Sequence, residues 1–339
     1  MQFYQEARGA GITNGSSRQA AEDDAGCEAV QRPGQRGVYA FGIKLAVGIS
    51  LIAFLLRHYD FHGTSRLIGR EHPLVFAAVV FLFIAVQTVS ALRWQLLARI
   101  NGIAGSYREY LAYYFIGMFT NVFVPGLVGG DAARALYLGR RHNRIGEAVT
   151  SVLADRGAGL LGLFWLAAGA SLCLTGVKLP AAAFHATLAA AGVSLAACAA
   201  APLIVKPALR IARLRSLLAP LTPYLCRPVA LIPAIALSVA LQVSFALCQY
   251  LLGLGLNLRI PLAAFLLMVP ISNVIASIPI SINGLGLREA SYVVLLGMAG
   301  VSESQAVALS ILYFAATLAA GLAGIVPFIM TPLPAAHDE

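Results

Sequence analysis

The chain has 339 residues, of which 59% are hydrophobic and only 12% are charged. A soluble domain carries about 25% charged residues, so this composition excludes an ordinary soluble protein and predicts a helical membrane bundle. The formal net charge is +9, but the basic residues lie between apolar runs, where membrane topology and anionic lipid head groups favour them. This placement argues against nucleic-acid binding. The five cysteines and six histidines are scattered, so we expect no metal site and no cofactor.

The ends of the chain differ in composition from its middle. Residues 1–36 are polar, rich in glycine and without helical periodicity, so we expect a disordered N-terminal extension. They contain no apolar core after a basic start, which argues against a cleavable signal. We expect residues 37–330 to form the membrane domain and residues 331–339 to form a short polar tail.

Apolar runs of the length needed to cross a bilayer predict an all-α, polytopic membrane protein. The segments between them that are richest in Lys and Arg are 93–109, 134–147 and 206–227, so the positive-inside bias places both termini in the cytoplasm. Six full crossings with two re-entrant pairs fit this pattern, and eight crossings with some shortened helices fit it too. The six predicted crossings are Val38–Leu56, Pro73–Leu92, Ala148–Thr175, Ala182–Val205, Ala230–Leu252 and Gln305–Met330.

The stretch Thr120–Arg141, reading TNVFVPGLVGGDAARALYLGRR, interrupts an apolar segment. Pro125-Gly126 predicts a break, and Gly129-Gly130 allows close backbone approach. Asp131 and Arg134 then follow where hydrocarbon penalises both charges. Because lipid cannot satisfy interrupted backbone, we expect this stretch to face protein or a wet cavity. A new helix after the glycine pair would point its free N–H groups at an anion, or Asp131 would simply cap that helix.

A second stretch, Pro279–Ala290, reads PISINGLGLREA and repeats the residue types of the first in the same order. Pro279 precedes Arg288 by nine residues, as Pro125 precedes Arg134. Three of the six predicted crossings separate the two stretches, so the second stretch enters from the opposite side. This layout predicts an inverted repeat whose broken helices meet at a substrate site.

Arg134 and Arg288 are the strongest candidates for binding a substrate. A guanidinium stays charged when buried and holds a phosphate bidentately, whereas Arg134 alternatively belongs only to a cytoplasmic basic loop. In the second stretch, Asn283 is a candidate for lining a head-group cavity, and a new helix after Gly284 would point its free N–H groups at an anion. Glu289 alternatively does no more than neutralise an arginine.

Asp155 and Arg156 are adjacent inside a predicted crossing. Neighbouring residues face about 100° apart on a helix, so these two side chains pair poorly with each other and each needs a partner elsewhere. We predict the ion pairs Asp155 with Arg288, or Asp131 with Arg156. A purely structural role for such pairs is as plausible as a proton relay.

Three motifs in order carry a resemblance to a known family: FTNVFVPGLVGGDAARALYL, ADRGAGLL at Ala154–Leu161, and PISINGLGLREA. Together they resemble the flippase-like transmembrane family of lysylphosphatidylglycerol synthases, over roughly residues 40–330. The resemblance implies a polytopic inner-membrane protein that moves a charged or glycosylated lipid between leaflets. In aminoacyl-lipid members a separate soluble domain makes the lipid; we expect no such domain, and so no synthase activity, in this chain. The motif positions carried over are Pro125, Gly126, Gly129, Gly130, Asp131, Arg134, Asp155, Arg156, Asn283, Gly284, Gly286, Arg288 and Glu289.

The function we expect is translocation of an anionic, aminoacylated, glycosylated or isoprenoid lipid in the bacterial inner membrane, without covalent chemistry. Arg134 and Arg288 would engage the phosphate from opposite leaflets, while Asp131, Asp155 and Glu289 balance charge or relay protons. Two alternatives stay open: a membrane transferase acting on a lipid carrier, and a non-transporting partner of a lipid-modifying enzyme. The expected partners are a membrane lipid and, in the last case, that enzyme; a homo-oligomer is compatible with either.

Overall fold

A computed structural model of the chain describes residues 67–69, 72–123, 129–173, 181–208, 219–277 and 286–334. All of them belong to one compact unit, Val47–Glu339. Every regular element in these ranges is a helix, which confirms the predicted all-α, polytopic membrane fold. The N-terminal extension, the predicted crossing Val38–Leu56 and both proline breaks, at Pro125 and Pro279, lie outside the described residues.

The helices follow the predicted apolar segments closely. The long ones are α4 (Pro73–Ile100), α7 (Ile145–Cys173), α8 (Ala181–Ala208), α11 (Pro228–Gly255) and α14 (Glu303–Leu322). The shorter ones are α5 (Tyr107–Phe123), α6 (Gly129–His142), α10 (Thr222–Leu225), α12 (Leu262–Ala276), α13 (Leu287–Gly297) and α15 (Ile325–Met330), with a 3₁₀ turn at Ala219–Leu221.

Within the described ranges, five segments are long and apolar enough to cross a membrane. They are Pro73–Ile100, Ile145–Leu172, Phe184–Ala201, Pro228–Gly255 and Glu303–Met330. These are the predicted crossings apart from Val38–Leu56. The short helices α5, α6, α12 and α13 flank the two predicted breaks, as expected for interrupted elements.

The helix ends follow from local sequence. Pro228 occupies the first turn of α11, where its missing N–H costs nothing. Ser302 caps α14, accepting a hydrogen bond from the Gln305 backbone N–H, and Gln305 reaches back in a capping box. Gly286, which caps α13, has φ of +84°. This conformation suits glycine because a Cβ is strained there.

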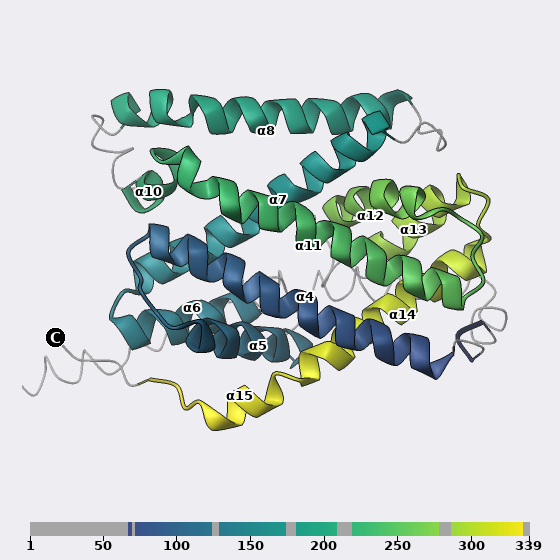
Figure 1. Cartoon of the computed structure of the whole chain (residues 1–339), viewed down its shortest axis with the longest axis horizontal. Helices are drawn as coiled ribbons and strands as arrows, with labels where there is room; N and C mark the ends of the chain where they lie inside the picture. The colour runs from purple at the N-terminus through teal and green to yellow at the C-terminus, as the bar shows by residue number, and fades with distance from the viewer. Residues whose placement is uncertain are drawn as a thin grey trace, which may run out of the picture. The chain divides into compact units, whose positions relative to one another are not determined.

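Most buried apolar side chains of the described residues belong to two of three clusters. The larger joins the N-terminal half of α4 to α11, α12, α13 and α14, and includes Phe83 and Phe265. The smaller joins the C-terminal half of α4 to α5, α6 and α7, and includes Trp94 and Tyr110. Helices α4 and α11 pack against each other along the middle of the bundle, whereas α8 lies at one edge and packs mainly on α7 (Figure 1).

Helices α5 and α6 form a tightly packed hairpin. A Cβ added to Gly130 would overlap the carbonyl oxygen of Gly117, and the Gly130 N–H donates to Asn121 Oδ1 at 2.8 Å. On the face of α5 that packs against α14, Gly321 lies against Val122. A Cβ at Gly324, just after α14, would overlap the backbone of α5. Gly321 and Gly324 therefore let the end of α14 and the residues after it pack closely on α5.

One helix is longer than its apolar pattern predicts. The crossing Pro73–Leu92 was expected to end before Arg93, but α4 continues to Ile100. The reason is that Arg93 is buried and faces a carboxylate inside the bundle. Because Arg93 is neutralised inside the bundle, the helix continues past it.

Candidate functional site

The first broken stretch places its charged residues at the start of α6. This helix begins at Gly129, so Asp131 lies in its first turn and is not the N-cap. The capping role considered for Asp131 is therefore wrong. Both of its carboxylate oxygens instead face arginines: Oδ1 lies 3.0 Å from an Arg134 terminal nitrogen, and Oδ2 lies 2.7 Å from Arg156 Nε.

Ion pairs join these residues to two further helices. Asp155 of α7 holds Arg134 through Oδ2, at 2.9 Å, and holds Arg93 of α4 through Oδ1, at 2.8 Å. The result is a continuous row, Arg93–Asp155–Arg134–Asp131–Arg156, which we call the arginine–aspartate row. It contains three arginines and two aspartates, and so has one excess positive charge.

Most of the row is buried. Arg134 is 4% exposed and Asp155 is 2% exposed. Two aromatic rings, Trp94 and Tyr114, each lie 5.1 Å from the Arg134 guanidinium, a distance at which the ring face attracts a cation. Trp94 is itself fixed by its N–H, which donates to Ser151 at 3.1 Å. Because an unpaired buried charge costs several kcal/mol, this matched arrangement explains why Arg134 is tolerated here.

The row is open to its surroundings at one end. The Arg93 end is closed, since Arg93 donates to Asp155 and to Ser238 of α11, at 3.0 Å. The Arg156 side chain at the other end is 48% exposed, and that of Asp131 is 19% exposed. An approaching anion therefore meets Arg156 first, and the buried arginine lies behind it.

The predicted ion pairs are resolved by this geometry. The pair Asp131–Arg156 is confirmed. The alternative pair Asp155–Arg288 is wrong, because both Asp155 oxygens are held by Arg93 and Arg134. Sequence reasoning missed Arg93, which it assigned to a loop. The signal available was its position in register with a buried apolar helix face that also includes Val86 and Trp94.

The second broken stretch places Arg288 and Glu289 in the first turn of α13. Arg288 is half-buried, and its guanidinium lies 5.8 Å from the ring of Tyr313 on α14. Glu289 is buried; its carboxylate accepts hydrogen bonds from the Gly286 backbone N–H and from the Ser310 hydroxyl, the latter at 3.0 Å. The candidates Asn283 and Gly284 lie outside the described residues.

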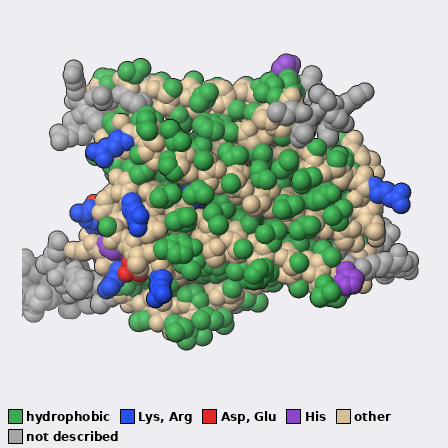
Figure 2. Space-filling view, viewed as in Figure 1, with side chains coloured by type: hydrophobic (Ala, Val, Ile, Leu, Met, Phe, Trp, Pro, Cys, Tyr) green, Lys and Arg blue, Asp and Glu red, His purple; other side chains and the backbone are tan. Residues whose placement is uncertain are grey.

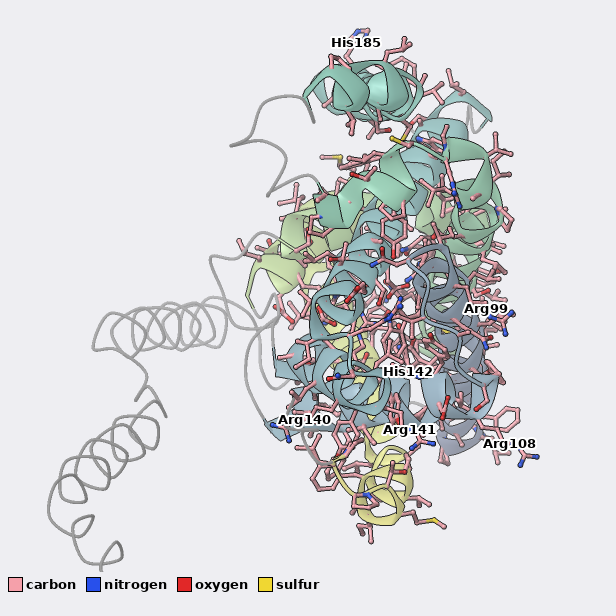
Figure 3. The ribbon with its side chains drawn as sticks, turned by 90° about the vertical axis from the view of Figure 1, so that its left-hand side faces the viewer. Arg99, Arg108, Arg140, Arg141, His142 and His185 are labelled. Carbon is pink, nitrogen blue, oxygen red and sulfur yellow. The ribbon has the colours of Figure 1, made fainter. Side chains whose placement is uncertain are left out.

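Basic side chains on the surface form a separate feature at one end of the bundle. Figure 3 labels Arg99 of α4, Arg108 of α5, and Arg140 and Arg141 of α6 on this face. Arg141 lies 3.6 Å from Glu109, but its side chain is 60% exposed, so the pair contributes little to stability. In the space-filling view, hydrophobic side chains cover the middle of the visible face (Figure 2). This division is typical of a membrane protein.

One known protein family matches a region of the chain that includes both broken stretches. The sequence model of the lysylphosphatidylglycerol synthase TM region matches residues 42–324. The chain belongs to this family. The match to the lysylphosphatidylglycerol synthase TM region confirms the resemblance carried by the three motifs and identifies a multi-pass membrane protein. The matched region is a transmembrane region and not a catalytic domain. No curated protein and no solved structure matches the chain.

Proposed function

We propose that this protein translocates a lipid with an anionic phosphate head group between the leaflets of the plasma membrane. The observation that carries the proposal is the arginine–aspartate row, which holds one excess positive charge inside an apolar bundle and ends on a half-exposed arginine. Ionisable residues within membrane bundles mark substrate pathways. Aminoacylated, glycosylated and isoprenoid phospholipids share the phosphate that this charge attracts.

Arg156 is the first contact for the phosphate in this mechanism. It uses Nε to hold Asp131, so its two terminal nitrogens present the fork that binds a phosphate bidentately. Arg134 adds positive potential from within, where its two aspartates fix its position. When no phosphate is bound, the two aspartates stabilise the arginines.

Arg288 provides the second contact, in the other half of the bundle. It follows its proline at the spacing found in the first stretch, and it lies in the first turn of a short helix, where backbone N–H groups also favour an anion. A head group passing between the leaflets would be handed from Arg156 and Arg134 to Arg288. Arg134 and Arg288 lie on the short helices α6 and α13, which follow the two predicted breaks. Transporters use interrupted helices at such sites.

A plasma-membrane location with both termini in the cytoplasm belongs to the same proposal. The arginines gathered at one end, Arg99, Arg108, Arg140 and Arg141, support it (Figure 3), because basic residues favour the cytoplasmic side. The phosphate would then reach Arg156 from the leaflet nearest this end.

The test is translocation of acyl-labelled fluorescent phosphatidylglycerol in phosphatidylcholine proteoliposomes, read by dithionite quenching of the outer leaflet. The variant Arg156→Gln removes the exposed fork and leaves the buried part of the row intact. A hydrogen bond to a charged group contributes about 1.5–3 kcal/mol, so we expect the protein-dependent rate to fall about tenfold or more.

The matched control is Arg108→Gln, which removes an exposed arginine from α5, outside the row. This variant should keep the rate of the unmodified protein. If Arg156→Gln, Arg134→Ala and Arg288→Ala all translocate the probe at the unmodified rate, or if the unmodified protein moves no probe, the proposed function is wrong.

A further inference from the structure

Glu289 is a buried acid whose surroundings differ from those of the other buried acids. Its exposed fraction is 7%. Its carboxylate accepts from two neutral donors, the Gly286 backbone N–H and the Ser310 hydroxyl of α14. Among the described residues it forms no ion pair, whereas Asp155, which is also buried, forms two. Within the described part of the chain, both donors to this carboxylate are therefore neutral, and no arginine pairs with it.

The elements packed around Glu289 bring few charged or titratable groups to it. On α13 itself these are Arg288 and Tyr292, and Tyr292 donates to Gln249 of α11. Helix α14 contributes Tyr313, over whose ring the Arg288 guanidinium lies. Helix α11 contributes Cys248, and α12 has no charged residue. Arg288 is thus the one permanent charge near Glu289 in the described part of the chain.

We infer that Glu289 is the proton-binding site that couples lipid movement to a pH difference across the membrane. The inference rests on the proposed function, and it adds an energy source. Arg288, which engages the phosphate, and Glu289 lie next to each other in the first turn of α13. With Glu289 ionised, its negative charge opposes a phosphate at Arg288; with Glu289 protonated, that opposition is gone.

The proton step balances simply. A water-borne proton from one side adds to a carboxylate oxygen of Glu289 and gives the neutral acid, which favours phosphate at Arg288. Loss of the same proton to the other side restores the carboxylate and expels the phosphate. The hydrogen bonds permit both forms, since the Ser310 hydroxyl donates to the carboxylate and accepts from the acid.

The first experiment imposes a pH difference on phosphatidylcholine proteoliposomes that contain labelled phosphatidylglycerol, with the membrane potential clamped by potassium and valinomycin. If one proton moves per lipid, a difference of about one pH unit supports about a tenfold difference in probe between leaflets. A protonophore should abolish this asymmetry. Probe that moves but stays equally distributed overturns the coupling and leaves the proposed function standing; probe that does not move overturns the proposed function itself.

The second experiment detects the proton directly and does not depend on transport. Infrared difference spectra between acidic and neutral pH should show a protonated-carboxyl band that is missing in Glu289→Gln. The control Glu303→Gln removes an exposed acid from the start of α14 and should keep the band. A band that persists in Glu289→Gln overturns the inference, as does a lipid asymmetry that this variant keeps.

A milder variant guards against a Glu289→Gln protein that fails to fold. Ser310→Ala removes one of the two donors to the carboxylate and so disfavours the ionised form. The pH midpoints of the infrared band and of the transport rate should therefore both move upward. Midpoints that stay unchanged would assign Glu289 a capping role only.

Discussion

The regions around the two broken stretches differ in how their acids are neutralised. At α6 and α7, Asp131 and Asp155 lie between three arginines. At α13, the Glu289 carboxylate accepts hydrogen bonds from a backbone N–H and a hydroxyl, while the Arg288 guanidinium lies over an aromatic ring. In the first arrangement arginines hold the acids, and in the second the donors to the acid are neutral among the described residues. Two elements that the sequence relates by repeat thus have unlike electrostatic roles.

The largest expected effect that tests this difference is that of Asp155→Asn. The substitution leaves Arg93 and Arg134 buried without their shared counter-charge, and breaking a buried pair costs about 3–5 kcal/mol. The apparent free energy of unfolding in detergent micelles titrated with SDS should fall by that amount. Glu147→Gln, on the same helix but outside the row, serves as the control and should change it by less than about 0.5 kcal/mol.

Arg93→Gln should have an intermediate effect. It removes the Asp155 ion pair and the hydrogen bond to Ser238, but Arg134 still neutralises Asp155. Hydrogen bonds to charged groups contribute about 1.5–3 kcal/mol, so the same SDS titration should show a loss of about 2 kcal/mol. Arg99→Gln, on the exposed end of α4, should lose less than about 1 kcal/mol. Equal losses for both arginines would mean that the row does not stabilise the fold.

Glu289→Gln should have the smallest effect on stability of the three. The amide oxygen still accepts from the Gly286 N–H, its NH₂ group reaches the Ser310 hydroxyl, and no arginine is left without a counter-charge. A neutral hydrogen bond contributes about 1 kcal/mol, and the loss measured by SDS titration should not exceed it. A loss as large as that of Asp155→Asn would remove the distinction between the two regions.

The apolar pattern predicts the fold well because hydrocarbon imposes the length of a crossing. Its errors come from charges that the bundle neutralises. The end of α4 was placed before Arg93 because an unpaired arginine belongs at an interface, and only the fold reveals the carboxylate of Asp155 facing it. The start of α6 was placed two residues late, because the glycine pair was assigned to the break, whereas the helix includes both glycines.

The candidate site was predictable in its members more than in its pairing. Adjacent Asp155 and Arg156 were expected to need separate partners, and they have them, because they face different sides of α7. Which arginine each acid meets depends on how α4, α6 and α7 pack, and sequence spacing holds no such information. Asp131–Arg156 was predicted, whereas the two arginines on Asp155 were not.

The close contact between Gly117 and Gly130 has a mechanical consequence. With no side chain between the two backbones, and with Asn121 holding the Gly130 N–H, α5 and α6 have no room to hinge against each other. The hairpin therefore acts as a single lever that carries Arg134 at one end. Gly321 and Gly324 pack on the other face of α5 in the same close way, since a Cβ at Gly324 would overlap the carbonyl oxygen of Phe115. Larger residues at these two positions would push α14 away from the hairpin without touching any charge.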